Sequence, residues 1–325
     1  MRDHSNGSRI VVQSSNVAPL KSVTSRWPFL FGDRRVPFVL AAAVLGVSLS
    51  GPLVRLSNAH PLVIASWRLA FSLLIIGIAL AITGQWRQWR RLSGSELAIA
   101  LGAGALLALH FWSWNTGVGL TSVAASVVLV NTQPVVVALL SAIWLHEAPT
   151  RRQWMGIAIA MLGALIVASP DFAADSTTAA AHPRALLGDM LSLVGAVTAA
   201  IYFVVGRRLR ATLDLWAYVG LVYGACFLVL LALVVATNAP LVPQPPREFA
   251  LFAALALGPM LIGHTGMNWA LKHAPAYVVN LTLLGEPIGA TIIAAMLPGI
   301  REIPGPATFV GGAIVLVGVL LAARR

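Results

Sequence analysis

Glu286 is the residue of this sequence whose type and position most favour chemistry. It lies about ten residues into a long apolar segment, so a helix rising 1.5 Å per residue would place it roughly 15 Å deep, near the middle of a bilayer. An ionisable group at that depth is costly and needs an explanation. We interpret Glu286 as a carboxyl that exchanges a proton for coupling or binds an amine of a substrate. The alternative is a carboxyl that is hydrogen-bonded to a neighbouring helix purely for packing.

Pro287, directly after this glutamate, frees a backbone carbonyl and permits a helix kink, which suits a cavity wall. A second pair of this kind, Gln133-Pro134, lies at a similar depth in an earlier apolar segment. Asn131 and Asn280 add amide groups to the same two segments. Two inverted kinks at the midplane are the expected outline of a cavity that opens to either side. Because Gln133 cannot titrate, only the second segment would carry the titrating group.

These pairs belong to a marker pattern that occurs twice, with a two-residue insertion as the one difference in spacing. The first copy is Asn115, Gln133-Pro134, Glu147, Gly156 and Gly163, and the second is Asn268, Glu286-Pro287, Glu302, Gly311 and Gly318. We expect five hydrophobic spans in each copy. An odd number forces the second copy to run inverted through the bilayer. Inverted repeats are typical of secondary transporters, whose binding site lies near the midplane.

Arg68 is a basic residue inside the second expected span, about ten Å from the outer end of that span. It would either neutralise an anionic group of a substrate or pair with a carboxylate. Asp189, one turn into the sixth expected span, is the only other acid near that depth on the outer side. A structural Arg68–Asp189 ion pair is therefore the competing interpretation, because charges in membranes usually find partners.

Aromatic, imidazole and amide side chains gather in the third expected span, where His110 and Trp114 share a helix face and Asn115 follows. The eighth span repeats part of this composition with His264 and Asn268. Such side chains would suit a cavity of mixed polarity. The alternatives are interfacial anchoring for the tryptophan and hydrogen-bonded packing for the two histidines.

The remaining markers favour structural roles. Glu147 and Glu302 each precede the next expected helix, so we interpret them as helix-capping or packing residues. The glycines of the fifth and tenth spans recur at roughly two-turn intervals, which predicts close helix contact within a protomer or between protomers. A homodimer is therefore one possible assembly.

The composition fits a membrane protein. Hydrophobic residues make up 58% of the chain, charged residues make up 10%, and the mean hydropathy is +0.84. A soluble domain carries about 25% charged residues. Lipid offers no hydrogen-bond partners to backbone groups, so the spans are expected to be helices. With five spans in each copy, the expected fold class is all-α integral membrane, with ten transmembrane helices in two inverted five-helix repeats. The expected spans are 37–55, 61–83, 95–117, 121–145, 153–169, 186–206, 214–237, 248–271, 276–298 and 305–323.

The polar segments complete this organisation. Residues 1–36 are Ser/Arg-rich and predict a disordered cytoplasmic tail. The first repeat would cover 37–169, a linking loop 170–185, and the second repeat 186–325. Most of the 22 Lys and Arg residues fall on the side of the N-terminus, so we expect an inner-membrane protein with both termini cytoplasmic. The exceptions are Arg55, Arg184, Arg247 and Arg301 in outer loops and Arg68 within a span.

Several function classes are disfavoured. The net charge of +11 is scattered between spans and not clustered on one face, so we expect no nucleic-acid partner. Cys226 is the single cysteine, and the seven histidines show no metal-ligand spacing, so no metal and no cofactor are expected. An intramembrane enzyme would need a converging set such as paired aspartates, which the dispersed ionisable residues do not supply.

The pattern resembles the ten-helix EamA-type transporters of the drug/metabolite transporter superfamily. The resemblance covers about residues 37–323 and rests on an ordered set of stretches. These are Pro61 to Arg68, Thr121 to Ala125, Thr132-Gln133-Pro134, Leu145-His146-Glu147, Gln153 to Gly163, Gly188-Asp189, Leu284-Gly285-Glu286-Pro287 and Glu302 to Gly318. The resemblance implies two five-helix inverted repeats around a central cavity, with the fifth and tenth helices to one side. It also implies carriage of small metabolites, amino acids or drugs, frequently as efflux, without an ATP site.

The sequence therefore predicts a secondary carrier that is not an enzyme. It would work by alternating access of the two repeats around the level of Gln133 and Glu286. Few fixed charges line the expected cavity, so a mostly neutral or zwitterionic, partly apolar solute fits best. Proton-coupled efflux and an uncoupled facilitator, in which Glu286 is purely structural, both stay open at this point.

Overall fold

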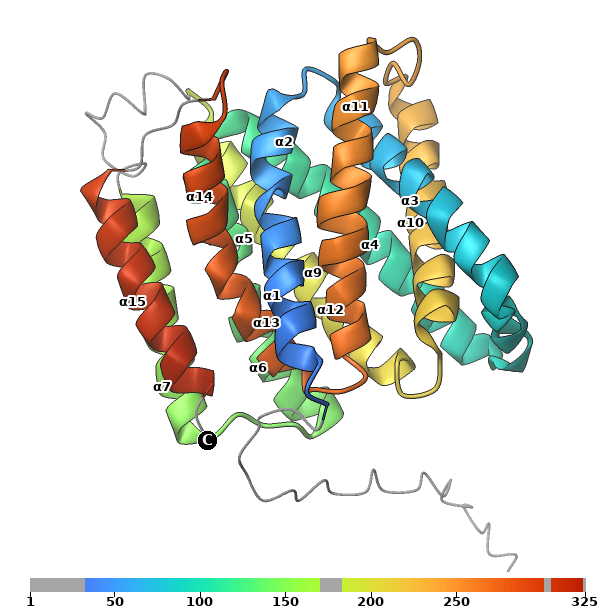
Figure 1. The fold of residues 1–325 in the computed structure, drawn as a ribbon, viewed down its shortest axis with the longest axis horizontal. Helices are drawn as coiled ribbons and strands as arrows, with labels where there is room; N and C mark the ends of the chain where they lie inside the picture. The colour runs from blue at the N-terminus through green and yellow to red at the C-terminus, as the bar shows by residue number, and fades with distance from the viewer. Residues whose placement is uncertain (1–32, 170–182, 301–304, 324–325) are drawn as a thin grey trace, which may run out of the picture.

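The computed structural model describes residues 33–169, 183–300 and 305–323. Every regular element in these residues is helical (Figure 1). Eight helical units are long and apolar enough to cross a membrane. Two further helices of 18 residues each, α7 and α15, are about 27 Å long at 1.5 Å per residue, close to the thickness of a hydrocarbon core. The all-helical membrane fold expected from the sequence is confirmed. Residues 1–32 of the predicted tail, residues 170–182 of the predicted linking loop and Glu302 lie outside the described residues.

The first half of the chain forms five spans. They are α1 (Val36–Ser48) with α2 (Ser50–Leu56), then α3 (Pro61–Thr83), α4 (Gly94–Leu120), α5 (Val123–Val130) with α6 (Gln133–Leu140), and α7 (Arg151–Ala168). A short 3-10 helix, Gln85–Arg91, joins the second span to the third. A capping box formed by Ser93 and Glu96 begins α4.

The second half repeats this order. Its spans are α9 (Ala185–Leu209), α10 (Leu215–Thr237), α11 (Pro246–Leu255) with α12 (Thr265–Ala270), α13 (Ala276–Thr282) with α14 (Glu286–Met296), and α15 (Pro306–Ala323). A π-helical segment, Ala256–His264, connects α11 to α12 around Pro259. These bounds agree with the spans expected from the sequence to within a few residues.

Breaks within spans occur at the positions that the proline pairs predict. The fourth span is interrupted at Asn131 and Thr132 before Gln133-Pro134 starts α6, and the ninth span tightens to a 3-10 turn at Leu283–Gly285 before Glu286-Pro287 starts α14. Proline lacks the backbone N–H that an uninterrupted helix needs, so each pair begins a new helix. The predicted kinks are confirmed.

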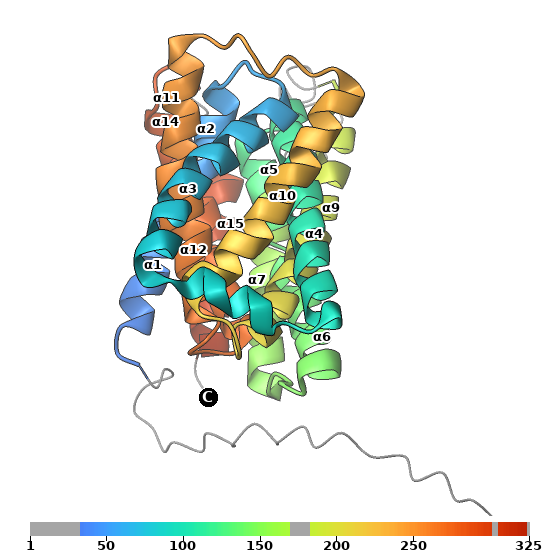
Figure 2. The same ribbon diagram turned by 90° about the vertical axis from the view of Figure 1, so that its right-hand side faces the viewer.

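Helix contacts follow the twofold relation between the halves. The third span packs on the sixth, α4 against α9, and the equivalent eighth span packs on the first through the π-helical segment and α12 against α1. The second and seventh spans, α3 and α10, contact each other, as do the fourth and ninth. Figures 1 and 2 show the other spans around one centre, and Figure 1 shows α7 and α15, the fifth and tenth spans, together at one edge. Because each half has five spans, equivalent helices run in opposite directions.

Glycines allow α7 and α15 to lie backbone to backbone. A Cβ atom placed on Gly163 would lie 2.6 Å from the carbonyl oxygen of Gly311, and one on Gly318 would lie 2.5 Å from the backbone nitrogen of Ala160. Small residues permit this approach, which van der Waals contact stabilises in lipid. The predicted close helix contact is confirmed within the protomer.

Replacing Gly318 by Val is expected to destabilise the fold. The branched side chain would push α15 away from the backbone of Ala160, and overpacking of this kind costs about 1–3 kcal/mol. Thermal unfolding of detergent-purified protein should show a Tm lower by several degrees. Gly77→Val is the matched control, because a Cβ on Gly77 in α3 meets nothing within 4 Å. Equal Tm values for the two variants would contradict this packing.

Basic side chains near the helix ends are distributed unevenly between the two faces of the bundle. We call the face where α1 begins and α15 ends the basic face, and the other the opposite face (Figure 1). The described basic residues at the basic face are Arg34, Arg35, Arg87, Arg90, Arg91, Arg151, Arg152, Arg207, Arg208, Arg210 and Lys272. Those at the opposite face are Arg55, Arg184 and Arg247.

Candidate functional site

A small cavity of about 30 Å³ lies at the centre of the bundle, between the two repeats. Its lining residues are Val47, Ser50, His110, Trp114, Val130, Gln133, Ala199, Phe203, His264, Met267, Leu283 and Glu286. They come from spans one, three, four, six, eight and nine. Each half thus supplies three of the spans. This volume holds one or two water molecules, whereas small-molecule sites occupy about 300 Å³ or more. The central cavity of this structure is therefore smaller than a small-molecule site.

Glu286 is the first residue of α14 and is 7% exposed. The side-chain amide of Asn131 donates a hydrogen bond of 3.1 Å to its carboxyl oxygen Oε2, so this contact joins the two broken spans. Gln133, the equivalent first residue of α6, lines the same cavity and is 5% exposed. The structure thus brings together Glu286, Gln133 and Asn131, three of the residues that the sequence singled out.

Aromatic rings form one wall of the cavity. His110 and Trp114 lie on one face of α4 with their rings parallel and 6.3 Å apart, and His264 stacks with Phe203 at 6.4 Å. The Nδ1 atom of His110 is 2.9 Å from the carbonyl oxygen of Gly195. Trp114 Nε1 and His264 Nδ1 are buried and have no hydrogen-bond partner among the described residues. These two nitrogens are therefore available to a polar group in the cavity.

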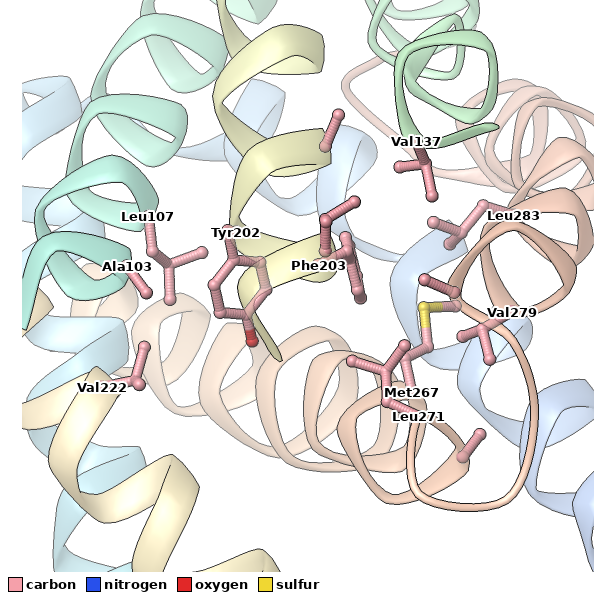
Figure 3. Packing of buried hydrophobic residues seen from close by; sticks show 14 of the residues in the cluster. Ala103, Leu107, Val137, Tyr202, Phe203, Val222, Met267, Leu271, Val279 and Leu283 are labelled. Carbon is pink, nitrogen blue, oxygen red and sulfur yellow. The ribbon is translucent and has the colours of Figure 1, made fainter. Parts of the chain in front are cut away.

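Phe203 and Met267 close the cavity with apolar surface. In Figure 3, Phe203 of α9 points toward the side of Met267 and Leu283, whereas the hydroxyl of the adjacent Tyr202 points elsewhere. Ser50, Phe203 and Met267 line the cavity but were not predicted from the sequence. Gly51-Pro52, directly after Ser50, was a usable signal for a break in the first span. Phe203 and Met267 had no such signal in the sequence, because their apolar side chains resemble many others in the spans.

Three predicted amide residues lie away from the cavity. Asn115 donates to the carbonyl oxygen of Pro61 at 3.3 Å, and Asn280 donates to Ala276 within its own helix at 3.0 Å. The amide of Asn268 donates to the hydroxyls of Tyr202 and Tyr223, at 2.5 and 3.1 Å. None of the three amide residues lines the cavity. In this structure their amide groups instead donate to backbone carbonyls or to tyrosine hydroxyls, and a role for them in substrate binding or coupling stays a prediction.

Arg68 is fully buried beside the cavity but does not line it. Its guanidinium lies over the ring of Phe111, 4.3 Å from the centroid, and Nη1 is 3.4 Å from the hydroxyl of Ser50, which does line the cavity. No carboxylate of the described residues lies within 4 Å of it. The competing prediction of an Arg68–Asp189 ion pair is therefore wrong.

A contact at the basic face joins the repeats. Arg207, near the end of α9, makes a 2.8 Å ion pair with Glu147 after the fourth span, and it donates to the carbonyl oxygen of Leu271 at 2.6 Å. Glu147 does not cap α7, because Thr150 and Gln153 form that capping box. Of the two structural roles expected for Glu147, capping or packing, the structure does not show capping of α7 and shows instead an ion pair with α9. We call the Arg207–Glu147 pair the basic-face latch.

Nearby, Asp214 accepts hydrogen bonds from Gln88 at 2.8 Å and from Lys272 at 3.0 Å. These two bonds lower the pKa of Asp214. The aspartate therefore stays charged at neutral pH, and it ties the loop after α9 to the first repeat.

A second contact joins the repeats at the opposite face. Glu248, at the start of α11, is 4% exposed. It accepts hydrogen bonds from the hydroxyl of Ser57 and, at 3.2 Å, from the backbone N–H of Asn58. The neighbouring Arg247 donates to the carbonyl oxygen of Leu56 at 2.9 Å. We call the contact of Glu248 with the loop after α2 the opposite-face latch.

Two inverted repeats around a central cavity of mixed polarity in a helical membrane bundle are the architecture of a membrane transporter. The model of the EamA-like transporter family matches residues 35–169 and again residues 186–324, and the chain belongs to this family.

Relatives carry transporter names. An uncharacterized transporter of Archaeoglobus fulgidus is 26% identical over 82% of this chain and 89% of its own length. A protein of Streptantibioticus cattleyicolor, named as a probable terminal-alkyne amino-acid exporter, is 28% identical over 78% of this chain and 82% of its own length. A solved crystal structure with 18% identity matches at a TM-score of 0.67 over 88% of this chain and 96% of that chain, a likeness of fold. The protein is a transporter.

Proposed function

We propose that this transporter is a secondary carrier that moves a small, zwitterionic, partly apolar solute of the amino-acid type out of the cell. The solute would bind in an expanded form of the central cavity, beside Glu286 and Gln133. Proton exchange at Glu286 would couple its movement to the proton gradient. The basic face would lie in the cytoplasm, with the protein in the inner membrane, as the positive-inside rule predicts.

Alternating access is supported by the contacts at the two faces. The cavity is too small for an amino acid, and both latches are closed. A contracted site between two closed latches is what an occluded intermediate of a carrier requires. Opening one latch at a time would expose the cavity to one face and then to the other.

The amino-acid class is supported by two observations. The cavity combines a carboxyl with aromatic and aliphatic walls, which suits an ammonium group attached to an apolar side chain. A relative over most of both chains is named as a probable terminal-alkyne amino-acid exporter. The single observation that carries the proposal is Glu286 in the cavity between two broken, inverted helices.

The two alternative functions, an uncoupled facilitator and an intramembrane enzyme, predict different behaviour. An uncoupled facilitator of the same fold would move solute at a rate insensitive to an imposed pH gradient. An intramembrane enzyme would change a solute chemically, and the described residues contain no group of three or more His, Cys, Asp or Glu side chains that could hold a metal ion. Both readings are tested with the same purified protein.

The test begins with a thermal-shift screen of small apolar L-amino acids, including L-propargylglycine, at two pH values. A ligand that binds the folded state alone raises the Tm by mass action. We expect several of these amino acids to raise the Tm and to be taken up unchanged by proteoliposomes when the lumen is acidic. Uptake that ignores the pH gradient would favour the facilitator, and a chemically altered solute would favour the enzyme.

A further inference from the structure

Arg68 is the buried charge whose bonding is least complete. Its side chain is 0% exposed, yet Nε and Nη2 have no hydrogen-bond partner among the described residues. Its one hydrogen bond is the 3.4 Å contact to Ser50. Taking an ion out of water costs several kcal/mol unless its charge and its donors find partners. The ring of Phe111 offsets part of that cost as a cation–π partner.

A second buried arginine of this fold shows the usual solution. Arg210 is 2% exposed, and it donates through Nε to the backbone carbonyl of Asn268 at 3.0 Å and through Nη1 to that of Leu213. Its donors thus satisfy one backbone carbonyl near the end of α12 and one in the turn between α9 and α10. The free donors of Arg68 therefore need a separate explanation, because burial alone does not leave a guanidinium unpaired.

The position of Arg68 relative to the cavity supplies that explanation. Ser50 lies between the two, since it bonds Arg68 and lines the cavity. Glu286, from the ninth span, lines the same cavity as Ser50. The site therefore offers the Glu286 carboxyl. Behind the Ser50 hydroxyl it also offers the Arg68 guanidinium, whose Nε and Nη2 groups have no acceptor among the described residues.

We propose that Arg68 is the carboxylate-binding group of the expanded site, and that it selects zwitterions over amines of the same shape. The carboxylate of the solute would accept from Nε and Nη2, the fork geometry that guanidinium groups present to carboxylates. The ammonium group would lie toward Glu286, and the side chain would lie against Phe203 and Met267. This proposal rests on the proposed function and adds to it the orientation of the solute.

Paired ligands test the proposal on the unaltered protein. L-Leucine and L-propargylglycine would be compared with their carboxamides, which keep the ammonium group and side chain but lack the carboxylate charge. We expect each acid to bind about tenfold or more tightly than its carboxamide, because hydrogen bonds to charged groups are the strong ones. Equal Kd values for acid and carboxamide would overturn the proposal whether or not any variant folds.

Variants then assign the preference to Arg68. Arg68→Gln should bind acid and carboxamide about equally, and Ser50→Ala should keep the preference because it leaves Nε and Nη2 intact. Arg90→Gln, an exposed residue of the basic face, is the matched control. Arg68→Lys replaces the glutamine variant if the latter does not fold, and it should retain a reduced preference.

The outcomes distinguish a failure of this proposal from a failure of the proposed function on which it rests. A preference for acids that survives in Arg68→Gln overturns the assignment to Arg68, whereas amino-acid transport would still stand. A protein that binds neither ligand and transports no amino acid overturns the proposed function, and the assignment of Arg68 with it.

Discussion

Replacing Glu286 by Gln is expected to lower pH-gradient-driven amino-acid transport about tenfold or more, which corresponds to about 1.4 kcal/mol in the barrier. The amide has nearly the shape of the carboxyl, and its oxygen can still accept the hydrogen bond from Asn131. It cannot exchange a proton or carry a charge opposite an ammonium group. The fold should therefore survive while coupling is lost. Initial rates in proteoliposomes, with and without an acidic lumen, measure this effect.

Gln133→Ala is the companion variant, because Gln133 is the equivalent residue of the other repeat. It should weaken binding without abolishing the response to the pH gradient. The exchanged double variant, Gln133→Glu with Glu286→Gln, should recover part of that response, since both side chains line one cavity. If Glu286→Gln transports and binds as well as the unaltered protein, the assignment of this site fails.

Disrupting one latch at a time should change the face from which the cavity is accessible. Ala199→Cys in a Cys226→Ala background places one reporter thiol in the cavity wall. Glu147→Ala should raise labelling of this thiol by a membrane-impermeant maleimide added at the basic face. An ion pair of this kind is worth up to about 1 kcal/mol, so the expected increase is roughly fivefold. Glu248→Ala should raise labelling from the opposite face.

Glu96→Ala is the matched control for the latches. Glu96 lies at the same face as Glu147, but its hydrogen bonds go to Ser93 within its own capping box. It should leave labelling unchanged from both faces. Labelling that rises equally from both faces in Glu147→Ala would mean general loosening, and it would contradict a gate at the basic face.

Much of the fold followed from the sequence for physical reasons. The span bounds came from apolar length, and the breaks at Gln133-Pro134 and Glu286-Pro287 came from the missing N–H of proline. Each repeat has an equivalent pair, a polar residue followed by proline. The twofold relation therefore brings Gln133 and Glu286 to one cavity. The fifth and tenth helices packed through the glycines that marked them.

The site was predicted less well because residue type does not fix the direction of a side chain. Trp114 lines the cavity, whereas Asn115, rotated by about 100° as the next helical residue, bonds the carbonyl of Pro61. Phe203 and Met267 have apolar side chains like many others in the spans. The Arg207–Glu147 latch could not be predicted, since it depends on where the last turn of α9 meets the loop after the fourth span.

Solute counterflow in proteoliposomes tests the central claim most directly, which is that one site is exposed alternately to the two faces. Vesicles containing the unaltered protein would be loaded with unlabelled L-leucine or L-propargylglycine and diluted into a trace of the same labelled amino acid. A carrier predicts transient accumulation of label above its outside concentration, because returning sites are occupied by unlabelled solute. Label that only equilibrates, at a rate unaffected by the internal amino acid, would contradict alternating access around Glu286 for these solutes.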